Sequence, residues 1–357
     1  MTFNSIVFFS LWILLSSCSG SLRNPPDHKI EQASLVNFGD TVAALGKNLS
    51  GLLQDDDGIF WLVSNGDGVF RYDGKTLTNF TEEDGLCSNF VFGIQKDHKG
   101  QLWFSTRDGI CNFDGNKFTN YTHTVENAPK GKLLYPVHGL FFGHLNGICY
   151  YDGHTFTNFV IHPETYTPPT HTYNRPYGIY STLVDKDGQV WFGTQSQGVC
   201  RYNGKTYNYL IEKDLAGPAV RTIFQDNSGH LWFGNNGGGL YRYDGKNLRN
   251  ITAEYGLGNP EFLKGNFAGK PGTLARVWSI NQDREGHIWI GTVDAGIWKF
   301  DGNQLTNFTT EDGLSGNSIS HIYKDRQGEL WYITNGGPTG SALCKFDGKM
   351  FKEYTFH

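Results

Sequence analysis

The sequence is poor in charged residues and in methionine, and neither sign of charge is in strong excess. Asp, Glu, Lys and Arg make up 18% of the 357 residues, the formal net charge is -5, and only 2 residues are Met. A nucleic-acid-binding protein needs a basic surface, which this composition does not supply. A disordered, solvating chain is excluded as well, because such chains are highly charged and lack aromatic residues.

The apolar run at the N-terminus is too short to span a bilayer as a stable helix. It extends from Ile6 to Leu15, the length of the core of a secretory signal. It ends in the stretch LSSC (15–18), which resembles the bacterial lipoprotein signal, in which cleavage precedes a cysteine that then carries lipid. We therefore expect residues 1–17 to be a signal peptide and Cys18 a lipid anchor. An unlipidated secretory peptide is the alternative.

The polar stretch 18–33 contains two prolines and is expected to be a tether between this anchor and the folded domain. Ser19 stands where aspartate is associated with inner-membrane retention. The expected location is therefore a bacterial envelope, with the outer membrane favoured and the folded part in the periplasm or at the cell surface.

Cysteine and histidine lack the spacing of metal sites. There is no CxxC and no HxxxH, so we expect no zinc site, no other metal and no cofactor.

Four cysteines share one repeat position, which other repeats fill with Phe70, Tyr241 or Trp298. A position shared with large apolar residues is a packing slot, so these thiols are interpreted as small hydrophobic side chains. Because equivalent positions in neighbouring repeats should lie beyond bonding reach, we expect no disulfides.

Glycine and aromatic residues, by contrast, are abundant and recur in one pattern. The chain has 46 Gly, 26 Phe, 18 Tyr and 9 Trp. Six stretches share the spacing Asp, two residues, Gly, two residues, Trp. The aspartates and tryptophans are Asp55 and Trp61, Asp97 and Trp103, Asp185 and Trp191, Asp226 and Trp232, Asp283 and Trp289, and Asp325 and Trp331.

A second element, an aromatic residue followed by Asp or Asn and then Gly, occurs seven times. Its glycines are Gly74, Gly115, Gly153, Gly204, Gly245, Gly302 and Gly348. The third unit lacks the first element, and there Phe141 stands in the tryptophan position. Asp-Gly and Asn-Gly supply the positive φ of tight hairpins, which explains this glycine without a functional site.

A period of 40 to 50 residues with several short alternating strands is typical of propeller blades. We predict an all-β fold, a single seven-bladed β-propeller of four-stranded antiparallel blades over residues 34–357. The expected blades are 44–82, 83–122, 123–161, 162–211, 212–252, 253–310 and 311–357. Residues 35–38 (LVNF) resemble an outermost strand, and we expect them to add to, or compete with, the final strand and so to close the ring.

The acidic turns at 54–58 and 185–188 invite a calcium interpretation, but the distal ligands of a calcium loop are missing. We expect these aspartates to cap the turn between the first and second strands.

The long insertions, 122–137, 160–178 and 252–277, all lie between blades. Together with the loops between second and third strands they should share one face of the propeller, where binding usually resides. Mixed aromatic, amide and arginine side chains suit sugars or acidic sugars. The alternative is that these aromatics pack their own loops. The candidate ligand-binding residues are Arg107, Tyr173, Arg175, Tyr177, Arg221, Asn235, Arg276, Trp278, Asp294 and His321.

The unit VDKDGQVWFGTQSQGVCRYNGKTYNYL (184–210) and its siblings resemble the two-component-regulator propeller repeat. That repeat builds the extracytoplasmic sensor part of many hybrid histidine kinases, which detect oligosaccharides. Such sensors usually pair two propellers and continue through the membrane to a kinase, whereas this sequence ends with its seventh repeat. The resemblance therefore implies a sensor-like module that binds an oligosaccharide, another small ligand or an envelope protein, with lipid as its only link to the membrane.

Two other classes stay open. Residues 175–194 also resemble the repeat of streptogramin lyases, seven-bladed propellers that use histidine, glutamate and magnesium. Their catalytic residues find no counterpart residue by residue, so no catalytic residue is assigned, and His321, His171 and Tyr177 are only candidates. A structural subunit of an envelope complex is the third class. An enzyme is expected less than a binding module.

Overall fold

The computed structural model describes the chain from Phe38 onward, with short gaps. The residues that it describes are 38–121, 125–127, 139–144, 147–159, 161–162, 177–212, 215–266, 269–337 and 340–356, with the backbone alone for 125–127 and His144. The expected signal peptide, Cys18 and the tether lie outside these residues, as do Tyr173 and Arg175.

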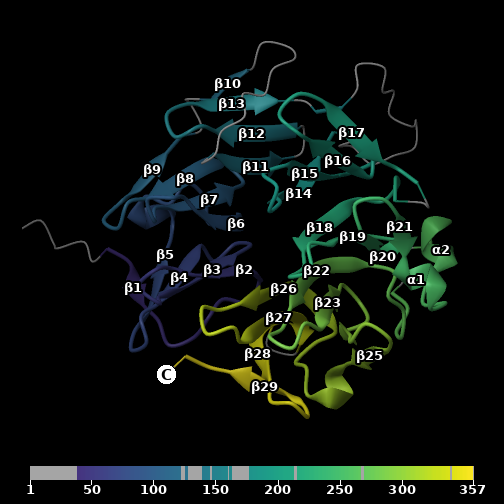
Figure 1. Cartoon of the computed structure of the whole chain (residues 1–357). Coiled ribbons are helices and arrows are strands. Elements are labelled where there is room, and N and C mark those ends of the chain that lie inside the picture. Colours follow the sequence, from purple (N-terminus) through teal and green to yellow (C-terminus); the bar gives the residue numbers. More distant parts are fainter. Residues whose placement is uncertain are drawn as a thin grey trace, which may run out of the picture. The chain divides into compact units, whose positions relative to one another are not determined.

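Seven β-sheets follow one another along the chain (Figure 1). Blades 1 to 3 contain β2 (Leu49–Gln54), β3 (Phe60–Ser64), β4 (Val69–Tyr72) and β5 (Leu77–Phe80), then β6 (Val91–Lys96), β7 (Leu102–Thr106), β8 (Gly109–Phe113) and β9 (Phe118–Asn120), then β11 (Leu140–His144), β12 (Gly147–Tyr151) and β13 (Phe156–Phe159). Blades 4 and 5 contain β14 (Ile179–Val184), β15 (Val190–Thr194), β16 (Val199–Tyr202) and β17 (Tyr207–Leu210), then β18 (Val220–Gln225), β19 (Leu231–Asn235), β20 (Gly239–Tyr243) and β21 (Leu248–Asn250). Blades 6 and 7 contain β22 (Val277–Gln282), β23 (Ile288–Thr292), β24 (Ile297–Phe300) and β25 (Leu305–Phe308), then β26 (Ser318–Lys324), β27 (Leu330–Gly337), β28 (Gly340–Phe346) and β29 (Phe351–Tyr354).

The strands named above pair antiparallel with their neighbours in each sheet, and the first strands of blades 4, 5, 6, 7, 1 and 2 contact one another in that order, while β11 of blade 3 contacts the first strand of blade 4. The predicted seven-bladed propeller is therefore confirmed. Helices are few and short among the described residues: α1 (Ile251–Glu254), α2 (Pro260–Leu263), and the 3₁₀ turns η1 (Glu82–Asp84) and η3 (Thr310–Asp312). None of the helices in this part of the chain has the length and apolar character needed to cross a membrane.

Blade 3 departs from the pattern. Phe141 in β11 lies opposite Tyr150, just as Trp191 in the second strand of blade 4 lies opposite Arg201. β11 is thus a second strand, with Phe141 in the tryptophan position as predicted. The fourth strand of this sheet is β10 (Val125–Asn127), which pairs in parallel with the outer side of β13.

Among the residues from Phe38 onward that the structure describes, no strand is exchanged between the two ends of the ring. β1 (Asp40–Thr41) pairs with β5 of blade 1, not with β29 of blade 7. Of the stretch 35–38, which we expect to add to, or compete with, the final strand, only Phe38 lies within the described residues, and the strand that follows it adds to blade 1. Phe38 packs on the rings of Phe80, Phe113 and Phe118, at centroid distances of 5.1, 6.0 and 6.0 Å, and this apolar contact holds the segment beside blades 1 and 2.

A glutamine bridge joins blade 7 to blade 1. Gln54, the last residue of β2, donates to Gly58 O in its own turn and accepts from the backbone N–H of Arg326 in blade 7, at 3.0 and 3.1 Å. Gln225 and Gln282 link blades 5 and 6 to the blades before them in the same way. The closing interface therefore repeats an interface found inside the ring.

The second strands are buried on both faces because a blade packs on each side. Trp191 is 2% exposed and Phe192 is fully buried. A glycine follows the equivalent pair in blade 5, Trp232 and Phe233, and lets the next blade approach closely. A Cβ on Gly234 would lie 2.5 Å from Cγ1 of Val277 in blade 6, so only glycine fits there.

The turn aspartates act as predicted. Oδ1 of Asp185 accepts from the backbone N–H groups of Asp187 and Gln189, at 3.0 and 2.8 Å. Its Oδ2 also accepts from the indole Nε1 of Trp191 at 2.7 Å, a bond that the sequence pattern did not predict. The same indole–carboxylate bond occurs in all six units that have both residues, at 2.7 to 3.0 Å.

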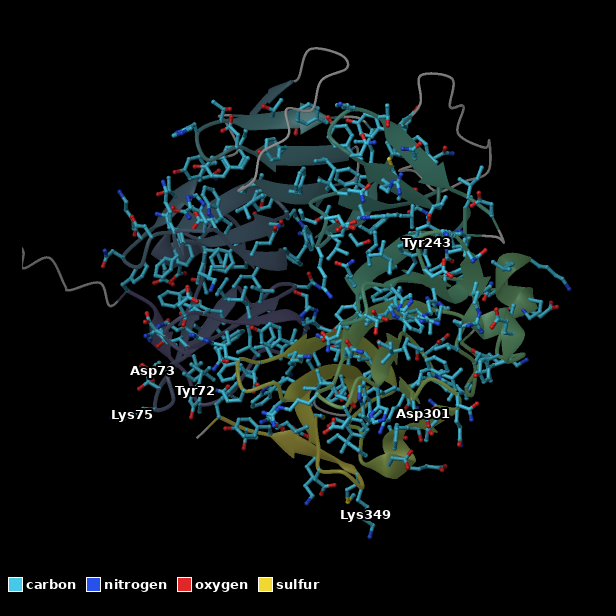
Figure 2. The ribbon with its side chains drawn as sticks, in the orientation of Figure 1. Tyr72, Asp73, Lys75, Tyr243, Asp301 and Lys349 are labelled. Carbon is cyan, nitrogen blue, oxygen red and sulfur yellow. A yellow bond between two sulfur atoms is a disulfide. The ribbon has the colours of Figure 1, made fainter. Side chains whose placement is uncertain are left out.

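The aromatic-Asp/Asn-Gly turns lie between third and fourth strands. In blade 1, Oδ1 of Asp73 accepts from the backbone N–H groups of Lys75 and Thr76, and Gly74 has φ 92°. Asp73, Lys75 and Lys349 lie at the outer rim of the ring (Figure 2). These turns are explained by hairpin geometry alone.

One cysteine prediction is wrong. Cys87 and Cys111 form a disulfide with a Cα–Cα distance of 5.8 Å. The prediction compared only equivalent positions in different blades, whereas Cys87 belongs to the loop that enters blade 2 and folds back over β8 of that same blade. Cys149, Cys200 and Cys344 are free and buried, as the packing-slot interpretation requires.

Candidate functional site

The loops between blades and the loops between second and third strands meet over blades 4 to 6. Of the three long insertions, the one at 252–277 is described most fully. It contains α2 and returns to the ring at Arg276, directly before β22. This arrangement places Arg276 and Trp278 beside the loop that follows β19.

A β-bulge occurs at the start of each first strand that the structure describes. The register shifts after the first paired residue, or after the second in β26, so that one residue stands out of the ladder in each strand. Such bulges re-aim a side chain. The residues at this bulge position are Ser50, Phe92, Tyr180, Arg221, Trp278 and Ser320.

In blades 4 to 6 the bulge residues contact one another. The guanidinium carbon of Arg221 lies 3.9 Å from the ring centroid of Tyr180 and 5.3 Å from that of Trp278. Each such cation–π contact is worth about 0.5–2 kcal/mol. The three side chains come from three successive blades, so the bulges build a row of ring, cation and ring along the inner rim.

A second group adjoins this row through Trp278. Nη1 of Arg276 lies 3.2 Å from Oδ2 of Asp294, and both side chains are mostly buried, 19% and 14% exposed. Asn236 links the groups, because its Oδ1 accepts from Nε of Arg276 at 3.2 Å and from Nε1 of Trp278 at 3.3 Å. Phe262 of α2 covers the face of the Arg276 guanidinium, with 4.8 Å to the ring centroid.

Two further features of this site are an unpaired carboxylate oxygen and a glycine that lets α2 pack closely. Oδ1 of Asp294 is buried and finds no hydrogen-bond partner among the described residues, so an acceptor remains unused. Gly237 holds α2 close to the ring: its φ is 155°, and a Cβ there would lie 3.1 Å from Phe262 Cδ1. We call Tyr180, Arg221, Asn236, Arg276, Trp278 and Asp294 the rim cluster.

Four of the ten predicted ligand-binding residues, Arg221, Arg276, Trp278 and Asp294, thus lie together. Asn235 is fully buried, and its side chain bonds Leu215 O, Pro218 O and the backbone N–H of Gly238. Its amide therefore holds its own loop in shape, and the neighbouring Asn236 is the residue that faces the cluster.

The other described candidates lie elsewhere. The guanidinium of Arg107 stacks on Phe90 of blade 2 at 3.4 Å. Tyr177 meets the ring of His162 edge-on at 5.2 Å. His321 lies in β26 of blade 7, where burial lowers its pKa to about 4.

Sequence reasoning did not select Tyr180, Asn236 or Phe262 as site residues. One signal in the sequence could have indicated this position. When the first strands are aligned with one another, Tyr180, Arg221 and Trp278 occupy the position that is serine in blades 1 and 7.

A groove of about 510 Å³ lies away from the rim cluster, between blades 1 and 2. Trp61, Phe38, Lys99 and Asp114 are among the residues that line it. Asp114 belongs to an aromatic-Asp-Gly turn, so this groove opens beside the turns and not on the predicted face.

One group of side chains has the composition of a metal site. Donor atoms of Asp283, Glu285 and His287 lie within 4.8 Å of one another. Oδ2 of Asp283, however, already accepts from Nε1 of Trp289 and contacts Nδ1 of His287 at 2.9 Å. The indole bond recurs in the other blades that have both residues, and Oδ1 of Asp283 caps the turn by accepting from the backbone N–H of His287, so these contacts account for the aspartate without a cation.

The repeats of this chain match a known family model. Five stretches, 85–108, 175–196, 214–237, 272–294 and 313–336, match the two component regulator propeller. The predicted resemblance is confirmed at these five stretches. A comparison with curated proteins found no match.

Solved structures share the fold. The extracellular domain of BT4673 from B. thetaiotaomicron, described as a one component system, is 20% identical with a TM-score of 0.59, and the match covers 85% of this chain and 39% of that one. Virginiamycin B lyase from Staphylococcus aureus is 16% identical with a TM-score of 0.59, covering 85% and 96%. The WD40 propeller domain of Doa1 is 11% identical with a TM-score of 0.53, covering 88% and 96%. At these identities the likeness shows the fold alone, and the chain spans less than half of the BT4673 domain.

Proposed function

We propose that this propeller is an exported, sensor-like binding module that takes its ligand, an oligosaccharide, at the rim cluster. The observation that carries the proposal is the contact between Arg221 and the rings of Tyr180 and Trp278, next to the Arg276–Asp294 pair. Ligand sites usually combine aromatic walls with a few polar groups of fixed orientation, and this cluster has both.

The chemistry of the cluster matches a sugar. Tyrosine and tryptophan rings stack on the apolar faces of pyranose rings, and guanidinium groups donate to hydroxyl or carboxylate oxygens. Asp294 adds an unused acceptor, Oδ1, whose desolvation costs about 1–3 kcal/mol until a donor reaches it. A ligand hydroxyl, directly or through a water molecule, meets that need.

The family supports the same conclusion. BT4673, described as a one component system, has an extracellular domain of which a part shares this propeller fold. We transfer from it the extracellular setting of the fold and nothing more.

Titration calorimetry with neutral and uronate-containing oligosaccharides tests the proposal. We expect saturable binding to the wild type and at least a tenfold loss in the Arg221→Ala/Trp278→Ala double variant. Lys75→Ala, at the outer rim, is the matched control and should bind normally. Unchanged affinity in the double variant would show that the ligand binds elsewhere.

The same samples separate the two other classes. A lyase would release a product with a new unsaturated bond that absorbs in the ultraviolet, and His321→Ala would abolish it. A structural subunit would bind no saccharide and would co-purify with envelope proteins. Either result would replace the binding-module proposal.

We further propose that Cys18 carries the lipid that holds the domain to a bacterial membrane, the outer membrane being favoured. The stretch LSSC (15–18) after the apolar run supports this. Metabolic labelling with a palmitate analogue should mark the wild type but not Cys18→Ala, and the variant should leave the membrane fraction. A wild type that is processed and unlabelled would identify an ordinary secretory signal.

A further inference from the structure

The bulge position forms a row that runs along the inner rim beyond the rim cluster. Oγ of Ser320 in blade 7 donates to Leu49 O in the first strand of blade 1, at 3.2 Å. Oγ of Ser50 in blade 1 donates in turn to Val91 O in the first strand of blade 2, at 2.8 Å. In each case the bulge side chain reaches the neighbouring blade, as Arg221 does in blade 5.

Phe92 is the member of this row in blade 2, and its exposure is unusual. Its neighbours Val91 and Gly93 pair with β7, and the bulge lifts Phe92 out of that ladder. The side chain is 56% exposed. An aromatic side chain that a bulge presents to solvent contributes little to packing and is available to stack on a ligand ring.

The seven-fold order of the ring places Phe92 across from the rim cluster. Blade 2 is three blades from blade 5 in one direction and three from blade 6 in the other, since blade 7 adjoins blade 1. Blades 5 and 6 are the ones that carry Arg221 and Trp278. On the side between blade 6 and blade 2, the row has only the serines, whose small side chains are turned onto the backbone.

We infer that Phe92 is a second ligand contact and that the ligand is an extended chain of rings that crosses the inner rim. One end stacks against Trp278 and Tyr180, and a later ring stacks on Phe92. A monosaccharide cannot reach both, so Phe92 determines specificity for ligand length. This inference rests on the proposed function, because it uses the same rim.

The test is a length series measured by calorimetry, from monosaccharide to hexasaccharide, in β-1,4-glucan, β-1,4-mannan and oligogalacturonide forms. We expect Phe92→Ala to weaken the longer members by about three- to tenfold, the cost of one aromatic stacking contact, and to leave the shortest binding member unchanged. Phe92→Tyr should restore the lost affinity. Val184→Ala, which shortens a 52% exposed side chain at the far end of a first strand, should bind every length like the wild type.

The outcomes separate this inference from the proposed function. Trp278→Ala should weaken every length. If it does while Phe92→Ala changes none, or changes all lengths equally, the crossing ligand is wrong and the rim cluster stands. If neither variant affects a saccharide that binds, or no saccharide binds the wild type, the proposed function fails and the inference falls with it.

Discussion

Trp191 donates its indole hydrogen to the carboxylate of Asp185 at 2.7 Å, and the other oxygen of that carboxylate caps the turn between the two residues. One side chain thus ties a surface turn to the buried wall of a blade. Asp185→Ala leaves a buried indole N–H and two turn amides without this acceptor. Because an unsatisfied buried donor costs about 1–3 kcal/mol, we expect a loss of about 2–4 kcal/mol, measured by urea denaturation.

The matched control is Asp187→Ala in the same turn. Its side chain is exposed, so we expect a change of less than about 0.5 kcal/mol. Equal losses in the two variants would show that the turn matters and the indole bond does not.

We predict that replacing one member of the Arg276–Asp294 pair lowers the free energy of unfolding more than replacing both members does. The two side chains are 19% and 14% exposed, so Arg276→Met leaves a largely buried carboxylate without its cation. We expect about 1–3 kcal/mol of destabilisation for Arg276→Met and a partial recovery in Arg276→Met/Asp294→Leu. Thermal unfolding of the single and double variants measures this. A double variant less stable than either single variant would mean that the pair is not the source of the loss.

Much of the fold could be predicted because each blade carries its own turn and core residues. The glycine after Asp73 requires a tight hairpin, and the tryptophan spacing repeats with the blade. The indole–carboxylate bond escaped prediction, although Asp185 and Trp191 are six positions apart in every such unit, because the pattern alone does not show that the turn folds the carboxylate back over the ring.

The site was harder to predict, for a physical reason. A bulge is a shift of backbone register, and no residue type predicts it. From the sequence, Tyr180 and Phe92 are therefore indistinguishable from ordinary strand residues. Arg221 and Trp278 were selected because they lie at or near the starts of first strands, on the same face as the long insertions. Cys87 was misjudged because the path of a loop, not its repeat position, brings it to Cys111.

Acid should weaken the fold between pH 6.5 and 4, and His321 should account for part of this. Burial lowers the pKa values of His321 and His162 to about 4, whereas an unfolded histidine titrates near 6.5. In this window the unfolded state binds protons that the folded state does not, so stability falls as pH falls. The carboxyl of Asp244, whose pKa the backbone N–H of Asn247 lowers to about 2, titrates below it.

Urea denaturation from pH 4.5 to 7.5 measures this slope. His321→Gln should reduce the slope by close to one proton. An unaltered slope in His321→Gln would mean that His321 is charged in the folded protein.

A second disulfide should form in blade 7 if Ser315 is changed to cysteine. The loops that enter blades 2 and 7 begin alike, with threonine N-caps at Thr81 and Thr309 that each form a capping box. Cys87 and Ser315 occupy the same place after these turns, and Oγ of Ser315 lies 3.7 Å from Sγ of Cys344. Since Cys344 is in the slot that Cys111 fills in blade 2, the Ser315→Cys thiol should oxidise with Cys344 as Cys87 does with Cys111.

Mass spectrometry of the oxidised variant should show one more linked peptide than the wild type, joining residues 315 and 344. The new bond should stabilise the protein by about 2–4 kcal/mol, lost on reduction. Ser318→Cys, in the adjoining strand, is the control and should keep a free thiol. If Ser315→Cys also stayed reduced under conditions in which Cys87–Cys111 is oxidised, the two loops would differ in path despite their matching caps, and the equivalence of the entries to blades 2 and 7 would be wrong.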